Sequence, residues 1–238
     1  MHRKIRCLIS SFDRFGQLEA NITEPVVDAL PEIICSNSAG LEIQVQKLTL
    51  RSCCFESWSQ LVRVLRSKPA PELVVLTGLA EKRDEICLER FALNIRDYRI
   101  ADNSGHRWEG EPIEPGGPEA VRTKIPLALI RDRLTTCGIA CAISNFAGSF
   151  VCNEAYYRTL RHLDGSATKN AALFVHLPTA ASYALAAWRQ GLADERAGVP
   201  PGEPEQTVAV FVRALTEIVA VSCQWLVAPG VITRQEPS

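Results

Sequence analysis

The chain has 238 residues, of which 47% are hydrophobic and 22% charged, and its formal net charge at pH 7 is −1. A chain of this length and composition can bury a substantial core, so we expect one large α/β domain rather than two small ones. Because the basic residues are scattered and the net charge is near zero, the sequence disfavours nucleic acid and anionic lipid as partners.

The apolar segments are too short to indicate a membrane anchor. Near the N-terminus only Cys7–Ile9 are consecutive apolar residues, fewer than the core of a signal peptide needs. The most apolar late segment, Ile218–Leu226, is shorter than a helix that spans a bilayer. We therefore expect a soluble protein without a membrane partner.

The nine cysteines favour a reducing compartment over a disulfide-linked scaffold. Their number is odd, no C-x-x-C occurs, and several lie in apolar runs, where a free thiol behaves as a small hydrophobe. The sequence therefore predicts a cytoplasmic protein. Because neither the Cys nor the His residues fall into two closely spaced ligand pairs, it also disfavours a zinc site.

Strands and helices alternate along the first third of the chain. A helix is expected from Thr23, as N-cap, through "EPVVDALPEII", with Pro31 able to shorten or kink it. The period-two alternation of "LEIQVQKLTL" predicts a strand near a sheet edge. The other elements expected here are a strand over 3–12, a helix over 55–67 and a buried strand over 71–78.

Residues 79–122 are charged and rich in Gly and Pro, so we expect a long functional or disordered loop there. Alternation resumes after this loop, and a Gly/Pro-rich linker over 192–205 precedes a last helix. The elements expected in this part are helices near 124–138, after Val151, over 181–191 and over 206–226, and strands over 139–144 and 171–178.

This alternation predicts a three-layer sandwich with a mainly parallel twisted sheet and helices on both faces. We expect one catalytic α/β domain over 1–228 and a disordered polar tail over 229–238. In such sheets ligands bind outside the carboxyl ends of the strands. Residues that follow strand ends are therefore the first candidates for a functional site.

Cys152 follows the strand "IACAIS" by a short turn that contains Gly148, and a helix is expected to begin beside it. The unpaired N–H groups at a helix N-terminus favour a thiolate and can also stabilise an oxyanion. A cysteine in this position can be a packing residue, a metal ligand or a nucleophile. Which of these three roles applies depends on the side chains that lie beside Cys152.

Two residues offer the partners that a nucleophilic thiol requires. His176 interrupts the end of the apolar strand "ALFVHLP", so it is expected to face the region where strands end, although a lone strand histidine can also be a hydrogen-bonded core residue. Glu89 lies among apolar residues in "ICLERFALN" and could orient the imidazole, or form a structural ion pair with Arg90 or Arg83.

The three segments "LERFALN", "SNFAGSFVCN" and "FVHLP", in this order, resemble the glutamate, cysteine and histidine motifs of the pyroglutamyl peptidase I family, also called pyrrolidone carboxyl peptidases. The resemblance extends from Ile5 to Pro178 and includes "SFDRFG", "RIADNSG" and "EPIEPGGPEA". It implies a cysteine exopeptidase that removes N-terminal pyroglutamate from peptides through a thioester, without a metal or cofactor. Members of the family commonly form homodimers or homotetramers.

Carried over by position, the resemblance makes Cys152 the nucleophile, His176 the base and Glu89 the group that orients His176. Phe12 and Phe15 look like the apolar walls around the pyroglutamyl ring, although their alternative is ordinary core packing. Leu79 resembles a position near the ring, and Arg99 one near the catalytic thiol, although a solvated or ion-paired arginine is the alternative there.

The first loop departs from the family pattern, because Ser11, Arg14 and Gln17 replace a glycine, a proline and a second glycine. This change alters the backbone conformations open to the loop and adds a charge near a pocket for a neutral ring. Two alternatives to pyroglutamyl peptidase therefore stay open. They are a related cysteine amidohydrolase with altered acyl specificity and a non-catalytic binding homologue.

Overall fold

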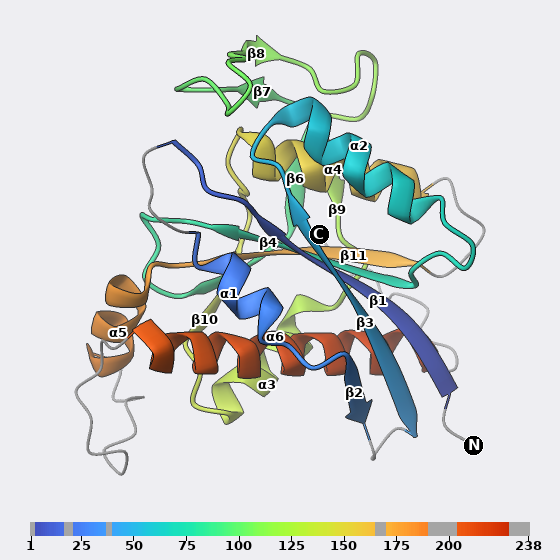
Figure 1. Cartoon of the computed structure of the whole chain (residues 1–238), viewed down its shortest axis with the longest axis vertical. Helices are drawn as coiled ribbons and strands as arrows, with labels where there is room; N and C mark the ends of the chain where they lie inside the picture. Colours follow the sequence, from blue (N-terminus) through green and yellow to red (C-terminus); the bar gives the residue numbers. More distant parts are fainter. Residues whose placement is uncertain (1–2, 17–20, 37–39, 165–169, 190–203, 229–238) are drawn as a thin grey trace, which may run out of the picture.

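A seven-stranded sheet forms the centre of the structure, which is a computed structural model that describes residues 3–16, 21–36, 40–164, 170–189 and 204–228 (Figure 1). The strand order is β10-β5-β11-β4-β1-β3-β2. These strands are β1 (Arg3–Phe12), β2 (Ile33–Ser36), β3 (Leu41–Leu50), β4 (Leu73–Leu79), β5 (Ile86–Glu89), β10 (Cys141–Ser144) and β11 (Ala171–Leu177).

The four central strands β11, β4, β1 and β3 run parallel to one another. The sequences of β4 and β11 are nearly continuous apolar runs, as expected for strands that are covered on both faces. Every residue of β11 is buried, and Leu73–Leu76 of β4 are fully shielded from solvent. The prediction of a single α/β domain with a mainly parallel sheet is confirmed.

Helices cover both faces of the sheet (Figure 1). Helices α2 (Cys54–Leu65) and α4 (Val151–Asp164) contact each other and enclose one apolar core with residues such as Leu8, Leu76 and Phe174. The opposite face carries a second core, formed with α1 (Thr23–Asp28), α3 (Leu127–Thr136) and α6 (Pro204–Val227). Helix α5 (Ala180–Arg189) contacts α6.

The predicted loop over 79–122 contains a strand of the main sheet and two small ribbons. Strand β5 pairs antiparallel with β11 and parallel with β10. Strands β5 and β10 therefore run in the opposite direction to the four central strands. The ribbons pair β6 (Phe91–Leu93) with β9 (Ala120–Arg122) and β7 (Arg96–Asp97) with β8 (Glu109–Glu111). The expectation of one irregular loop was wrong, because these short strands carry no usable periodicity.

The helix predicted from Thr23 ends early, and its last residues form β2. Pro31 follows the helix, where a proline cannot continue the helical hydrogen bonds. The predicted N-cap was also wrong. The hydroxyl of Thr23 accepts a hydrogen bond from the Phe12 backbone N–H at 3.2 Å and donates one to Asn21 Oδ1 at 2.8 Å, so it anchors the end of β1 instead.

Helix α6 is longer than the apolar segment identified in the sequence. By length and composition alone, Glu205–Val227 could cross a membrane. One of its faces, however, lies in the core, where Phe211, Leu215 and Ile218 are fully buried. A helix in the core of a globular domain can have the same length and apolar composition. The predicted tail over 229–238 lies outside the described residues.

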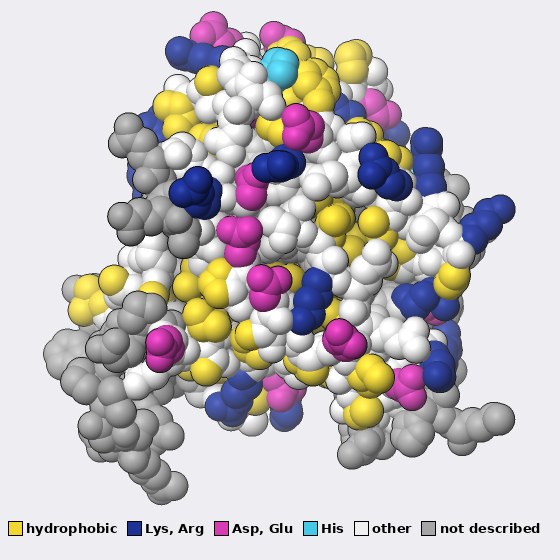
Figure 2. Space-filling view, viewed as in Figure 1, with side chains coloured by type: hydrophobic (Ala, Val, Ile, Leu, Met, Phe, Trp, Pro, Cys, Tyr) yellow, Lys and Arg dark blue, Asp and Glu magenta, His cyan; other side chains and the backbone are white. Residues whose placement is uncertain are grey.

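The surface carries charges of both signs. On the face shown in Figure 2, the Lys and Arg side chains are interspersed with Asp and Glu rather than gathered into one region. Among the described residues on this face there is no basic stripe of the kind that marks many nucleic-acid-binding proteins. The mixed pattern agrees with the near-zero net charge of the sequence.

Candidate active site

Glu89 and His176 form a buried pair on one face of the sheet. Glu89 is opposite Phe174 in the antiparallel register of β5 and β11, and His176 is two residues further along β11. The two side chains are therefore diagonal neighbours on the same face. The Nδ1 atom of His176 lies 2.8 Å from Oε1 of Glu89, and the two side chains are 8% and 0% exposed. This bond fixes the ring orientation and leaves Nε2 free for another partner.

Cys152 supplies that partner from the layer above the sheet. It is the second residue of α4, as the sequence predicted, and it is partly exposed. Cys152 lies close enough to His176 to help raise the pKa of the imidazole. The structure thus brings together the sulfur, the imidazole and the carboxylate that the sequence singled out. It places them at one face of the sheet, under the N-terminus of α4.

The electrostatic environment keeps the imidazole charged at neutral pH. Burial alone would lower the pKa of His176, but hydrogen bonds and charge interactions with Cys152 and Glu89 outweigh it and raise the pKa from 6.5 to about 9. The second carboxylate oxygen of Glu89, Oε2, is buried and has no hydrogen-bond partner in the described part of the chain. The imidazolium is therefore the group that compensates this buried carboxylate.

Gly78 makes room for the sulfur. It is paired with His176 across β4 and β11, so its missing side chain would lie on the same face. A Cβ atom at Gly78 would lie 2.9 Å from Cys152 Sγ and 2.9 Å from Cζ of Phe174. In the sequence this glycine indicates only the end of the strand expected over 71–78.

Four hydrogen bonds position α4 and its cysteine. The side chain of Asn153 accepts a hydrogen bond from the Leu93 N–H at 2.8 Å and donates to the carbonyls of Leu93 and Ile95. The hydroxyl of Tyr156 donates to the backbone carbonyl of Glu89 at 3.0 Å. Asn153 is therefore a residue that anchors the helix.

A small cavity of about 160 Å³ opens beside the sulfur. Its walls include all three apolar residues predicted to contact substrate, Phe12, Phe15 and Leu79. Phe150 completes the aromatic wall, since its ring centroid lies 5.0 Å from that of Phe15. The remaining lining residues are Asn21, Ser52, Glu81, Val151 and Cys152.

Two charged residues considered in the sequence are not among the residues that line the cavity. Arg99 is exposed, follows β7, and is not among the residues that line the cavity. Its proposed place near the thiol stays a prediction. Arg14 is also exposed and outside the lining, whereas Glu81 is part of it. Gln17 lies outside the described residues.

Comparison with known proteins places this site in a family. The family model described as pyroglutamyl peptidase matches residues 5–221. The pyrrolidone-carboxylate peptidase of Thermococcus onnurineus is 35% identical over 191 residues, which cover 80% of this chain and 92% of that protein. The protein of the same name from Vibrio vulnificus strain YJ016 is 35% identical over 178 residues, or 73% of this chain and 78% of that protein.

The fold agrees with solved structures of proteins with this name. Pyrrolidone carboxyl peptidase from Pyrococcus furiosus superposes with a TM-score of 0.78 at 28% sequence identity, and the match covers 94% of this chain and 100% of that chain. The match of the family model over most of the sequence and the agreement in fold lead to one conclusion. The chain belongs to the pyroglutamyl peptidase family of cysteine peptidases.

Proposed function

We propose that the protein is a cysteine exopeptidase that hydrolyses the amide bond after an N-terminal pyroglutamyl residue. The observation that carries this proposal is the position of Cys152 between two features. On one side it adjoins the buried His176–Glu89 pair. On the other it lines a small, mostly apolar cavity.

The first half of the reaction forms a thioester. The sulfur of Cys152, as the thiolate, attacks the carbonyl carbon of the pyroglutamyl group, and the carbonyl oxygen becomes an oxyanion. The N–H groups of the first turn of α4 have no acceptor within the helix and can stabilise this charge. His176 then gives its Nε2 proton to the amine, the C–N bond breaks, and the shortened peptide leaves.

The second half releases the acid. A water molecule gives a proton to Nε2 of His176 and attacks the thioester carbon, after which the C–S bond breaks and free pyroglutamate leaves. Throughout the cycle Glu89 holds the ring through Nδ1 and stabilises the positive charge on the imidazolium. Each step uses groups of this chain and water only.

The cavity suits a small neutral ring. Its volume of about 160 Å³ is below the roughly 300–1,000 Å³ of sites for drug-sized ligands. Pyroglutamyl is an uncharged lactam, so aromatic and aliphatic walls with a few polar groups match it better than a basic clamp does. Glu81 supplies the one charged side chain of the described lining. This carboxylate disfavours acyl groups that carry a carboxylate of their own.

The test is hydrolysis of a set of fluorogenic amides by the wild type and by Cys152→Ala. Pyroglutamyl amide is expected to be the preferred substrate over prolyl and glutamyl amides, with activity lost in the variant. Hydrolysis of a different amide in preference to the pyroglutamyl one would favour the amidohydrolase alternative. A folded wild type without turnover of any of these amides would favour the non-catalytic one.

We also propose that the protein is cytoplasmic and forms a homodimer or homotetramer. The free thiols throughout the described residues support a reducing compartment, and the family resemblance supports the oligomer. Light scattering after size-exclusion chromatography measures the oligomeric state directly. Fractionation of cells that express the tagged full chain measures its location.

A further inference from the structure

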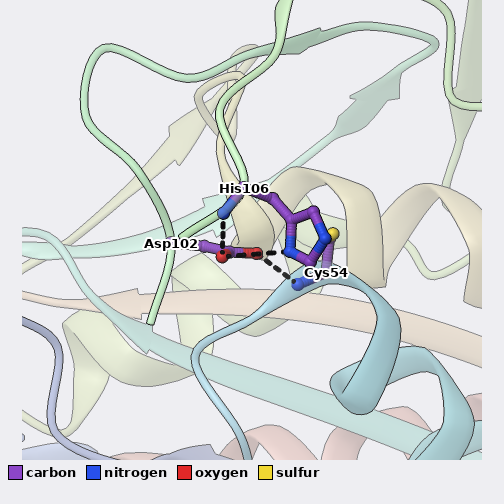
Figure 3. Close-up of side chains that lie close together, drawn as sticks. All are labelled: Cys54, Asp102 and His106. Carbon is purple, nitrogen blue, oxygen red and sulfur yellow. Dashed lines mark hydrogen bonds and ion pairs between the residues drawn. The ribbon is translucent and has the colours of Figure 1, made fainter. Parts of the chain in front are cut away.

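Three side chains outside the active site gather at the start of α2 (Figure 3). Cys54 is the first residue of this helix. Asp102 and His106 come from the segment between β7 and β8, which folds over the helix N-terminus. The sulfur, one carboxylate oxygen and one imidazole nitrogen all lie within 4.8 Å of one another.

The distances fit ligands around a small transition-metal ion. With Zn–S near 2.3 Å and Zn–N or Zn–O near 2.0–2.1 Å, two ligand atoms of a tetrahedral site are about 3.4–3.6 Å apart. Nδ1 of His106 lies 3.6 Å from Oδ1 of Asp102, which is too long for a hydrogen bond but matches that separation. The Cys54 sulfur lies within 4.8 Å of both atoms, so metal binding would draw the thiol toward them.

Unpartnered polar atoms point to the same place. Nδ1 of His106 and Nε1 of Trp108 are both buried without a hydrogen-bond partner in the described structure. Buried polar atoms of this kind call for an ordered water or ion. Trp108 adjoins Cys54, so a metal-bound thiolate would offer its unpartnered N–H an acceptor.

The backbone already holds Asp102 in place. Its Oδ2 accepts a hydrogen bond from Cys54 N at 3.0 Å, and its Oδ1 accepts bonds from the N–H groups of Ser104 and His106 at 3.0 and 2.9 Å. These bonds explain the carboxylate as a cap of α2. They do not account for the thiol or for the free Nδ1 of His106. Hydrogen bonds to a ligating carboxylate are also what orients it toward a metal.

We propose that Cys54, Asp102 and His106 bind one Zn²⁺ ion, with a water molecule as the fourth ligand. Cys54 loses its thiol proton to solvent as the Zn–S bond forms, so binding releases one proton. The ligand set of one thiolate, one imidazole and one carboxylate suits zinc and its spectroscopic substitute Co²⁺. The site has no closely spaced set of ligands in the sequence, because Cys54 is distant in the chain from the other two ligands.

A metal at this site would stabilise the wall of the catalytic cavity. Asn103, next to the ligand Asp102, donates from Nδ2 to the Arg14 carbonyl at 2.7 Å and accepts from Gly16 N–H at 3.3 Å. The backbone of Asn103 also donates to the carbonyl of Ser52, a cavity residue. The loop that carries Phe15 is therefore attached to the same segment as the proposed ligands.

The test measures Co²⁺ and Zn²⁺ binding in a Cys152→Ala background, which removes the catalytic thiol as a competing ligand. One Co²⁺ per chain is expected to bind with a thiolate-to-cobalt charge-transfer band, and Zn²⁺ is expected to displace it. At 100 times its Kd, Zn²⁺ should raise the Tm by roughly 5–10 °C.

The variants locate the site. Cys54→Ser and His106→Gln are each expected to weaken binding at least about tenfold, while the control Cys53→Ser, which changes the neighbouring buried thiol, leaves it unchanged. The side chain of His106 is 43% exposed, so His106→Gln remains informative if Cys54→Ser does not fold. Equal binding in His106→Gln, a spectrum without the thiolate band, or no binding at micromolar metal would overturn the proposal.

Discussion

Gly78 and Cys152 lie in direct contact across two layers of the fold, since a Cβ atom on the glycine would be 2.9 Å from the sulfur. The glycine belongs to β4 and the cysteine to the N-terminus of α4. The α4 end is held by the Asn153 and Tyr156 hydrogen bonds. The sulfur therefore cannot retreat freely from a larger residue below it.

Gly78→Ala is expected to reduce kcat by roughly 10²-fold, because displacing the thiol by about 1 Å disturbs the reacting geometry. The added methyl group also meets Phe174. The double variant Gly78→Ala/Phe174→Leu relieves that second contact, so it should regain thermal stability without regaining kcat. Steady-state kinetics and thermal unfolding of both variants separate the two effects. Full activity in Gly78→Ala would show that the sulfur has room to move.

Glu89→Gln is expected to lower kcat by roughly 10²–10⁴-fold, as replacement of an orienting carboxylate by its amide does in related relays. A glutamine amide can donate to Nδ1 of His176 and so favour the wrong tautomer. The control is Asp84→Asn, which removes an exposed carboxylate from the same segment. Equal kcat values for the two variants would contradict the role of Glu89.

The raised pKa of His176 predicts a pH-dependent contribution to stability. Because the pKa rises from 6.5 to about 9 on folding, the protonated imidazole stabilises the fold below about pH 6.5, and this contribution is lost as the pH rises through 9. The full change is on the order of 3 kcal/mol. It is measured as the difference in unfolding free energy between the wild type and His176→Asn from pH 6 to 10. A difference in unfolding free energy that does not depend on pH would contradict the raised pKa of His176.

Phe15→Ala is expected to lower kcat/KM for a pyroglutamyl amide by roughly 5- to 30-fold, because the cavity loses an aromatic wall worth about 1–2 kcal/mol. Arg14→Ala is the matched control, since Arg14 is adjacent in sequence but exposed and outside the lining. If Arg14→Ala has the larger effect, the charge of this loop rather than its aromatic ring governs substrate recognition.

Periodicity predicted the elements with long apolar or alternating patterns. Strand β1 covers Arg3–Phe12 as expected, and β11 ends one residue before the expected limit, Pro178. Strand β5 was missed because only four residues, Ile86–Glu89, form it between charged segments. Its antiparallel pairing with β11 is a property of the topology and has no local signal.

The residues of the candidate site also divide into those that have a local signal in the sequence and those that do not. Cys152, His176 and Glu89 could be found from their local contexts and the family motifs, but their diagonal arrangement depends on the β5–β11 register. Gly78 and Phe150 carried no signal of their own, because each matters only through a neighbour that is distant in the chain. The Cys54, Asp102 and His106 cluster was missed for the same reason.

Labelling by a pyroglutamyl chloromethyl ketone tests the central assignment most directly, since the reagent combines the ring of the proposed substrate with an alkylating group. Peptide mapping after inactivation should find one label per chain, on Cys152, with activity lost in proportion to labelling. The exposed thiol of Cys35 should stay unlabelled under the same conditions. A label on another residue, or full activity after Cys152 has been alkylated, would contradict the account.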